Sequence, residues 1–267
     1  MNVADNHLRA IREELENDTL ERPRTARSLI VLEDVSLTFD EPVLKAVSLE
    51  ANEGETLMIA GESGSGKSTI LKLILRLLVP ESGRITVLDE DVGSLTFQEA
   101  LDLRKQIGMV FQNAALFDSL SVFDNVAYPL RENTDFEEDR IEAVVREKLE
   151  FVDLDPEQVM RQLPSQLSGG MRKRVGVARA IATDPCIILY DEPTAGLDPL
   201  TVGRINALIR KLQRELNVTS ILVTHDIRAG FRVADRVNLL RQGEIVFDGS
   251  PEEMVAANDS YIKSFLS

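Results

Sequence analysis

The chain has 267 residues, 43% hydrophobic and 28% charged, so it holds enough apolar material for a sizeable globular core. Asp and Glu number 45 against 30 Lys and Arg, and the formal net charge of -15 argues against a surface that neutralises nucleic-acid phosphates. No apolar run approaches the length of a membrane span, and residues 1–27 lack the apolar core of a signal peptide. We therefore expect a cytoplasmic protein that binds no nucleic acid and reaches a membrane only through a partner.

The pattern along the chain predicts an α/β fold. Residues 1–27 combine a short helical periodicity with many charges, which indicates a charged N-terminal extension. Beyond it, strands are expected at 29–39, 47–52, 56–60, 84–88, 106–111, 186–191, 220–224 and 235–240. Helices are expected at 68–78, 122–131 and 140–152. Alternating strands and helices favour a core with parallel strands, and the loss of strand signal over about 113–166 indicates an inserted helical lobe.

A glycine-rich loop stands between an apolar strand and a predicted helix. It reads Gly61, Glu62, Ser63, Gly64, Ser65, Gly66, Lys67, Ser68 and Thr69, which fits the phosphate-loop pattern G-x-x-x-x-G-K-[ST]. Glycines let backbone N–H groups turn toward an anion, and the helix N-terminus adds partial positive charge. We expect Mg-ATP here, with Lys67 on the β- and γ-phosphates and Ser68 on Mg2+. The alternative is a plain glycine-rich turn.

A second chemical signal is an acidic pair at the end of the apolar run 186–190. A buried strand that ends in two carboxylates can deliver them to a site at its C-terminal edge. We expect Asp191 to hold Mg2+ through its water shell and Glu192 to act as the general base for an attacking water. A solvated loop or a helix cap is the alternative. Cys186, at the start of this run, is expected to be buried and reduced.

The segment Leu167-Ser168-Gly169-Gly170 strongly resembles the signature of the ATP-binding subunits of ABC transporters, and the similarity runs over residues 29–254. The resemblance implies a phosphate-loop NTPase of ABC type, with a mixed-sheet RecA-like core, an antiparallel β subdomain and an inserted α-helical subdomain. It also implies a head-to-tail dimer in which Ser168, Gly169 and Gly170 bind the γ-phosphate held by the opposite copy. The nucleotide-binding domain would span 28–256, with a tail at 257–267.

Four further residues match markers of the same family, and the resemblance implies their roles. Phe39 would stack on adenine, although a strand-end core aromatic is the alternative. Gln112 would approach Mg2+ and the attacking water. Asp198 would lie at the dimer interface, and it also suits the N-cap of a helix that begins near Pro199. His225 would contact the γ-phosphate.

A narrower resemblance, to the ATPases of Mla/Mce-type lipid transporters, rests on Met171 with the basic residues after it and on residues 115–126. It implies an integral-membrane permease and a lipid-binding Mce-type subunit as partners. It also implies that the substrate is phospholipid or another hydrophobic molecule, and that the chain lies on the inner face of the cell membrane. Phe117, Leu120 and Phe123 would then receive the permease, or would pack the core of the helical lobe.

Two other functions fit the same catalytic residues. An importer of a small polar solute, such as an amino acid, would share every catalytic motif. A soluble ABC ATPase of DNA repair, chromosome maintenance or translation would be expected to carry tandem domains, coiled-coil insertions or basic surfaces. This chain has one motif set and an acidic balance, which disfavours the soluble class.

Overall fold

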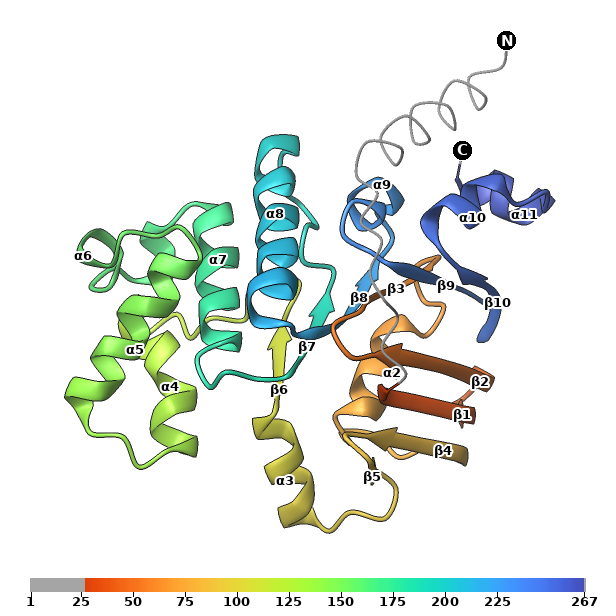
Figure 1. Ribbon diagram of the computed structural model, residues 1–267, viewed down its shortest axis with the longest axis horizontal. Helices are drawn as coiled ribbons and strands as arrows, with labels where there is room; N and C mark the ends of the chain where they lie inside the picture. Colours follow the sequence, from red (N-terminus) through yellow and green to blue (C-terminus); the bar gives the residue numbers. More distant parts are fainter. Residues whose placement is uncertain (1–26, 267) are drawn as a thin grey trace. The chain divides into compact units, whose positions relative to one another are not determined.

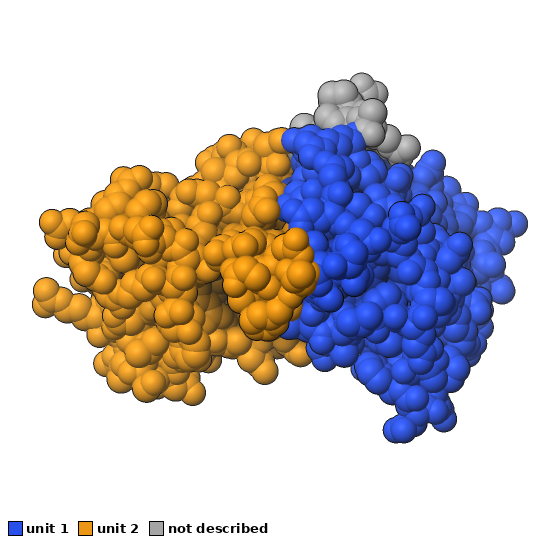
Figure 2. Space-filling view, turned by 90° about the horizontal axis from the view of Figure 1, so that it is seen from below, with its two compact units in different colours: residues 1–95, 219–267 blue, residues 96–218 orange. Residues whose placement is uncertain are grey.

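A computed structural model of the chain describes residues 27–266, so the predicted helix of the N-terminal extension lies outside the described residues (Figure 1). The chain divides into two compact units, 1–95 with 219–267 and 96–218 (Figure 2). In the described part of the chain, no helix combines the length and apolar character needed to cross a membrane.

The first unit contains two sheets and short helices. Its strands are β1 (Ser28–Thr38), β2 (Pro42–Asn52), β3 (Thr56–Gly61), β4 (Ser82–Val87), β5 (Glu90–Asp91), β8 (Thr219–Thr224), β9 (Arg236–Arg241) and β10 (Glu244–Gly249). Its helices are α2 (Lys67–Ile74), α9 (Ile227–Phe231), α10 (Pro251–Ala256) and α11 (Ser260–Phe265). One sheet is antiparallel, in the order β2-β1-β4-β5.

The other strands of this unit place the glycine-rich loop. Strand β3 is buried along its whole length and pairs in parallel with both β8 and β9, while β10 pairs with β9 in the antiparallel direction. Burial between two parallel neighbours explains why β3 reads as a continuous apolar run. The glycine-rich loop leaves β3 at its carboxyl end and leads into α2.

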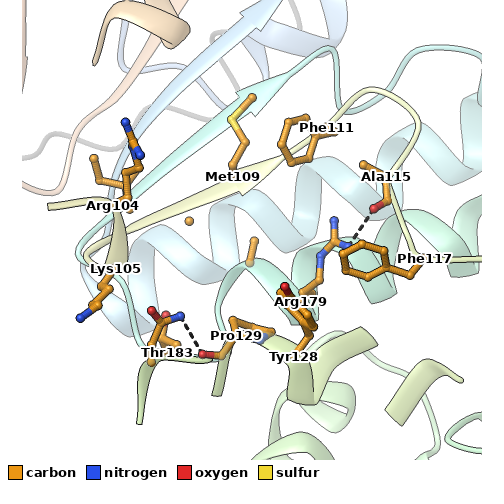
Figure 3. A pocket seen from close by; sticks show the side chains of 14 residues that line it. Arg104, Lys105, Met109, Phe111, Ala115, Phe117, Tyr128, Pro129, Arg179 and Thr183 are labelled. Atoms are coloured by element: carbon orange, nitrogen blue, oxygen red, sulfur yellow. Dashed lines mark hydrogen bonds between the residues drawn. The ribbon is translucent and has the colours of Figure 1, made fainter. Parts of the chain in front are cut away.

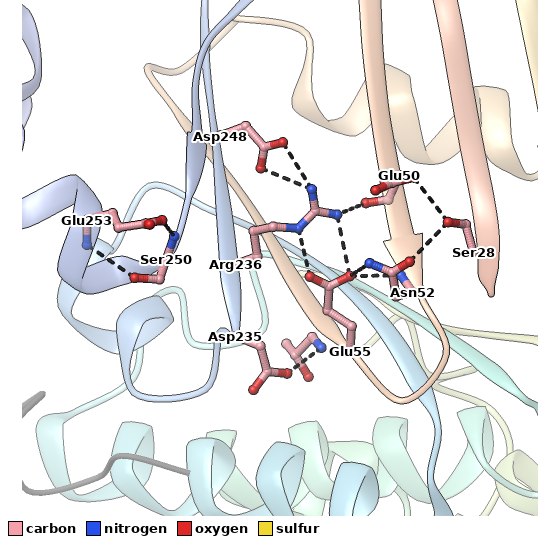
Figure 4. Close-up of polar contacts among 10 residues, drawn as sticks. Ser28, Glu50, Asn52, Glu55, Asp235, Arg236, Asp248, Ser250 and Glu253 are labelled. Carbon is pink, nitrogen blue, oxygen red and sulfur yellow. Dashed lines mark hydrogen bonds and ion pairs between the residues drawn. The ribbon is translucent and has the colours of Figure 1, made fainter. Parts of the chain in front are cut away.

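Arg236 connects the two sheets of the first unit (Figure 4). Its guanidinium donates to the Glu55 carboxylate at 2.7 Å, to both carboxylate oxygens of Asp248 on β10, and to the carbonyl of Glu50 on β2. Burial lowers the pKa of Arg236, but the hydrogen bond and the charge of Glu55 outweigh it, so the pKa is raised. The group is therefore charged and fully engaged in binding acceptors from both sheets.

The C-terminal helices pack on the mixed strands of the same unit. Ile262 of α11 and Met254 of α10 are buried in one apolar cluster with Phe231, and Tyr261 and Phe265 lie partly buried against it. The segment after residue 256 is thus part of the core of this unit. The domain boundaries expected from the sequence, including the tail at 257–267, stay a prediction.

The second unit contains a parallel pair of strands and a set of helices. The strands are β6 (Ile107–Val110) and β7 (Ile187–Asp191). The helices are α3 (Phe97–Lys105), α4 (Val122–Asn133), α5 (Glu138–Phe151), α6 (Pro156–Val159), the 3-10 turn η1 (Pro164–Gln166), α7 (Gly169–Ala180) and α8 (Pro199–Leu216). The helices α4, α5 and α7 pack on one another, and no strand lies between β6 and β7 among the described residues.

Two local expectations were wrong. The helix expected over residues 68–78 ends at Ile74, because Arg76 has a left-handed backbone and the amides of Leu77 and Leu78 turn back to the carbonyl of Lys72. Cys186 is exposed rather than buried, since it precedes β7 instead of lying within it.

Candidate functional site

The predicted site residues are divided between the two units (Figure 2). The first unit carries Phe39, the loop 61–69 and His225, and the second carries Gln112, Ser168, Gly169, Gly170, Asp191, Glu192 and Asp198. Each group is described within its own unit.

The glycine-rich loop of the first unit has the geometry of a phosphate loop. Lys67 is the first residue of α2. Its ammonium group donates to the carbonyls of Gly61 at 2.9 Å and Glu62 at 2.8 Å, so the lysine side chain folds back to the start of the loop. Gly66 has φ 106°, and a Cβ there would come within 2.8 Å of Leu44 and 3.1 Å of the carbonyl of Val43. Glycine is therefore required at this position on both conformational and steric grounds.

The loop fits a polyphosphate. The hydroxyl oxygen of Ser65 is buried and, within residues 27–266, has no hydrogen-bond partner. Helix α2 begins at this loop without a side-chain cap and without an acidic residue in its first turn. Its first N–H groups and partial positive charge therefore suit a bound anion, as do Lys67 and the Ser65 hydroxyl.

Phe39 and His225 of the same unit are both exposed. Phe39 directly follows β1, and 59% of its surface is accessible, which excludes the alternative that it is a core aromatic and leaves its ring available for stacking. His225 directly follows β8 and precedes the short helix α9, whose N-cap is Asp226. Both side chains stand at strand ends, where the sequence pattern placed them.

In the second unit, the acidic pair follows β7. Asp191 is the last residue of that strand and is half-buried, as is Glu192. Glu192 has φ 50°, a left-handed backbone that costs free energy for a residue other than glycine. The strand therefore ends in a sharp turn at the residue expected to act as the base.

Lys173 of α7 bonds to the backbone of two separate loops, one after β6 and one after β7. Its buried ammonium group donates to the carbonyl of Gln112 and, at 3.5 Å, to the carbonyl of Glu192. Desolvation lowers the pKa of Lys173, and the charge of Glu192 partly offsets that effect. The backbones at Gln112 and Glu192, 80 positions apart in the sequence, thus share one positively charged donor.

Ser168 and Asp198 each stand at the N-terminus of a helix. Ser168 is the N-cap of α7 and accepts a hydrogen bond from the amide of Met171 at 3.3 Å. Asp198 is the N-cap of α8, accepting from the amides of Leu200 and Thr201, and the Thr201 hydroxyl and these amides lower its pKa. A Cβ at Gly170 would come within 2.7 Å of the Thr201 side-chain methyl, so any larger residue at position 170 would displace that side chain.

A pocket of about 330 Å³ lies in the second unit, with aromatic and basic side chains in its lining (Figure 3). Phe111, Phe117 and Tyr128 provide rings, and Arg179 lies beside Phe117 with its guanidinium 5.9 Å from the ring centroid. Leu120 and Phe123, expected to form a surface with Phe117, are only partly exposed and do not line the pocket.

Two polar side chains fix the segment that carries Phe117. Arg179 donates to the carbonyls of Ala114 and Ala115, both at 2.8 Å, where both residues have positive φ. The buried amide of Asn125 accepts from the N–H of Phe117 at 2.8 Å and donates to its carbonyl at 3.1 Å. The loop after Gln112 is therefore held by side chains of α7 and α4.

The oxygen donors predicted for a metal are those that Mg2+ prefers. Among residues 27–266, no group of three or more His, Cys, Asp or Glu side chains is gathered as a metal site. The predicted donors, Ser68, Gln112 and Asp191, supply hydroxyl, amide and carboxylate oxygens. Such a small donor set fits Mg2+, which keeps several waters and binds substrate phosphates.

The family follows from a sequence comparison. A sequence model of the family described as ABC transporter matches residues 44–195, which include the glycine-rich loop, Gln112, the Ser168 segment and the acidic pair. The chain belongs to the ABC transporter family. As a member of that family it is an ATP-binding and ATP-hydrolysing transporter subunit, and the expected fold class is confirmed.

Curated relatives in the ABC transporter family agree over most of the chain. The "Intermembrane phospholipid transport system ATP-binding protein MlaF" of Haemophilus influenzae is 40% identical over 88% of this chain and 90% of its own length. The protein of the same name from Escherichia coli K12 is 37% identical over 91% of this chain and 90% of its own length. The "Probable ribonucleotide transport ATP-binding protein mkl" of Mycobacterium leprae is 37% identical, over 83% of this chain and 63% of its own length.

Solved ABC cassettes have the same fold. The ATP-binding cassette MJ0796, in a dimeric post-hydrolysis state bound to ADP and Pi, is 34% identical and gives a TM-score of 0.76 over 83% of this chain and 98% of its own. The cbiO1 subunit of an ABC transporter complex from Clostridium perfringens gives a TM-score of 0.79 at 31% identity, over 86% of this chain and 91% of its own. Homologous cassettes of the family thus form dimers.

Proposed function

We propose that the chain energises the movement of phospholipid through a separate membrane permease. Support for the substrate comes from the relatives named MlaF, which align over nearly the full length of the chain and of themselves. The relative named for ribonucleotide transport is similar at almost the same identity, but the chain spans less than two thirds of its length. Import of a small polar solute remains the alternative substrate class.

The observation that carries the ATPase chemistry is the lysine-spanned phosphate loop. We assign the phosphates of ATP to the loop 61–69, with Lys67 on the β- and γ-phosphates and with Ser68 and Asp191 as donors to Mg2+. Bound Mg2+ supplies countercharge to the phosphates. Glu192 accepts the proton of the attacking water, Gln112 and His225 orient that water and the γ-phosphate, and Phe39 stacks on the adenine.

A second copy of the chain completes the site in this proposal. The dimeric cassettes among its structural relatives support a paired arrangement. Helix α7 begins at Gly169, directly after its N-cap Ser168, and the N–H groups of its first turn other than that of Met171, together with its partial positive charge, suit a phosphate of the other copy. Asp198 contributes to the same head-to-tail interface.

We assign the permease contact to the pocket around Phe117 (Figure 3). Phe117, Phe111 and Tyr128 are each more than 40% exposed, and exposed apolar clusters of this kind mark interaction sites. Phe111 of the lining directly precedes Gln112, and Ala115 and Phe117 follow it closely in the sequence, so a partner bound there lies near the loop of a proposed catalytic residue. Through this contact the chain would lie on the inner face of the cell membrane, and a lipid-binding Mce-type subunit would join the complex.

The partner and the substrate can be tested together. The tagged protein would be purified in mild detergent from its own cells, and co-purifying proteins and lipids would be identified by mass spectrometry. We expect an integral-membrane protein and enriched phospholipid. A complex that contains a solute-binding protein and no enriched lipid would favour the importer of a polar solute instead.

The docking surface has its own test. Phe117→Asp replaces an exposed aromatic ring of the pocket with a charged side chain and is expected to abolish recovery of the membrane partner. Val246→Asp on β10 is the matched control, because Val246 and Phe117 are both 44% exposed and Val246 does not line the pocket. Equal recovery with both variants would exclude this pocket as the permease contact.

A further inference from the structure

Lys173 has an unusual position for a buried lysine. Only 6% of its surface is exposed, and the partners of its ammonium group are two backbone carbonyls, those of Gln112 and Glu192. Burying an ammonium group costs free energy unless it is well bonded. The two carbonyls bonded to the ammonium group therefore offset the cost of burying Lys173.

Lys148 of the same unit is a buried lysine for comparison, because carboxylates neutralise its ammonium group. It is 5% exposed, and its ammonium group forms ion pairs with Asp184 at 2.6 Å and Glu147 at 3.0 Å, both on the surface. Lys173 instead directs its donors to the main chain of two separate loops. Each of these carbonyls belongs to a residue with a proposed catalytic role.

The backbone at Glu192 needs such support. Its φ of 50° is unfavourable for a residue with a side chain, and such conformations persist where the surroundings hold them. A donor on the Glu192 carbonyl fixes the peptide group that follows the strained residue. The same donor on the Gln112 carbonyl fixes the loop after β6 relative to it.

We propose that Lys173 is a positioning residue for ATP hydrolysis, which sets the backbone of Glu192 and Gln112 through their carbonyl oxygens. It acts on the general base and on the water-orienting glutamine without contacting nucleotide. The inference rests on the proposed roles of these two residues. Misplacement of a reacting group by about 1 Å can cost about 100-fold in rate, so loss of the ammonium group is expected to lower kcat.

The test compares Lys173→Met with Lys148→Met in the purified complex of the chain with its membrane partner. Both changes remove one buried ammonium group from the same unit while keeping an unbranched side chain. For Lys173→Met we expect kcat to fall by about 10- to 100-fold, with the KM for ATP changed by no more than about 3-fold. For Lys148→Met we expect kcat near the wild-type value, although the thermal midpoint falls.

Two more variants keep the proposal testable if Lys173→Met is poorly folded. Lys173→Arg retains a charged donor and is expected to recover part of kcat, whereas Lys173→Gln is expected to stay low. Adding Lys173→Met to Glu192→Gln should lower the residual rate much less than in the wild-type background, because residues that act as a unit are not additive.

The outcomes separate this proposal from the proposed function. A Lys173→Met enzyme with kcat equal to that of Lys148→Met overturns the positioning role, as does an equal loss in the wild-type and Glu192→Gln backgrounds. If the wild-type complex hydrolyses ATP and Glu192→Gln hydrolyses it equally well, the assignment of the base is wrong instead.

Discussion

The hydroxyl of Tyr261 on α11 donates a hydrogen bond to the carboxylate of Glu62 in the phosphate loop, at 3.3 Å. The guanidinium of Arg241 lies 3.9 Å from the centroid of the tyrosine ring. Burial and the charge of Glu62 raise the pKa of Tyr261, so its hydroxyl is protonated at neutral pH and is able to donate. The C-terminal helix thereby contacts the second residue of the loop expected to bind ATP.

Removal of this hydroxyl is expected to weaken ATP binding modestly. Tyr261→Phe keeps the ring over Arg241 but releases the Glu62 carboxylate, whose negative charge then moves freely beside the phosphates. The hydrogen bond is exposed and contributes about 1 kcal/mol or less, so we expect the KM for ATP to rise by about 2- to 5-fold with little change in kcat. Steady-state kinetics measure both parameters.

The Glu62→Gln variant provides the control for this prediction. Without the negative charge at position 62, the Tyr261→Phe change should leave the KM unaffected. A rise of the same size in both backgrounds would show that the tyrosine acts on packing and not through Glu62.

Lys67→Ala is expected to weaken ATP binding strongly. The ammonium group lies in the loop, bonded to the carbonyls of Gly61 and Glu62, and we propose that it binds the β- and γ-phosphates. Hydrogen bonds to charged groups contribute about 1.5–3 kcal/mol. We therefore expect affinity to fall by about 10- to 100-fold. Calorimetric titration checks this, and unchanged affinity in a folded variant would contradict the role of Lys67.

Glu192→Gln is expected to bind ATP and to form a long-lived dimer. The change removes the proton acceptor but preserves the size of the side chain, so closure on ATP proceeds while hydrolysis stops. Size-exclusion chromatography with light scattering, with ATP and then with ADP, measures the dimer fraction. Normal turnover by this variant would exclude Glu192 as the base.

Arg236→Met is expected to destabilise the first unit by about 3 kcal/mol, because it leaves the carboxylates of Glu55 and Asp248 without their shared cation. Half of the Asp248 side chain is exposed, which places the loss at the lower end of the range for buried pairs. Denaturant unfolding measures it. Asp89→Asn is the control. Asp89 pairs with Arg27, and both side chains are well exposed, so the free energy of unfolding is expected to change by about 0.5 kcal/mol or less.

Much of the fold could be predicted from local sequence. Strands β3 and β7 are continuous apolar runs that end at functional loops, and both were located to within one residue. The end of α2 was not, because its apolar periodicity continues past Ile74 while Arg76 adopts a left-handed backbone that periodicity does not reveal. Cys186 was misplaced because an apolar run does not show which of its residues begins the strand.

The functional motifs were also visible in the sequence, but the residues that hold them were not. Lys173 lies between Arg172 and Arg174 in a basic run, and nothing in that run shows that Lys173 is buried. Its partners are 61 and 19 positions away, so only the folded chain shows the contact. The contacts of Arg179 with Ala114 and of Tyr261 with Glu62 could not be predicted for the same reason, since no local spacing relates the partners.

Asn125 has a further consequence for association. The Asn125 side-chain amide accepts a hydrogen bond from the N–H of Phe117 and donates to the carbonyls of Phe117 and Leu120. The segment that carries the aromatic ring is therefore fixed in the isolated subunit. Ordering of interface segments normally opposes complex formation through lost conformational entropy. A partner that docks on Phe117 meets a preorganised loop, and the entropy of that loop has been given up during folding rather than at the moment of binding.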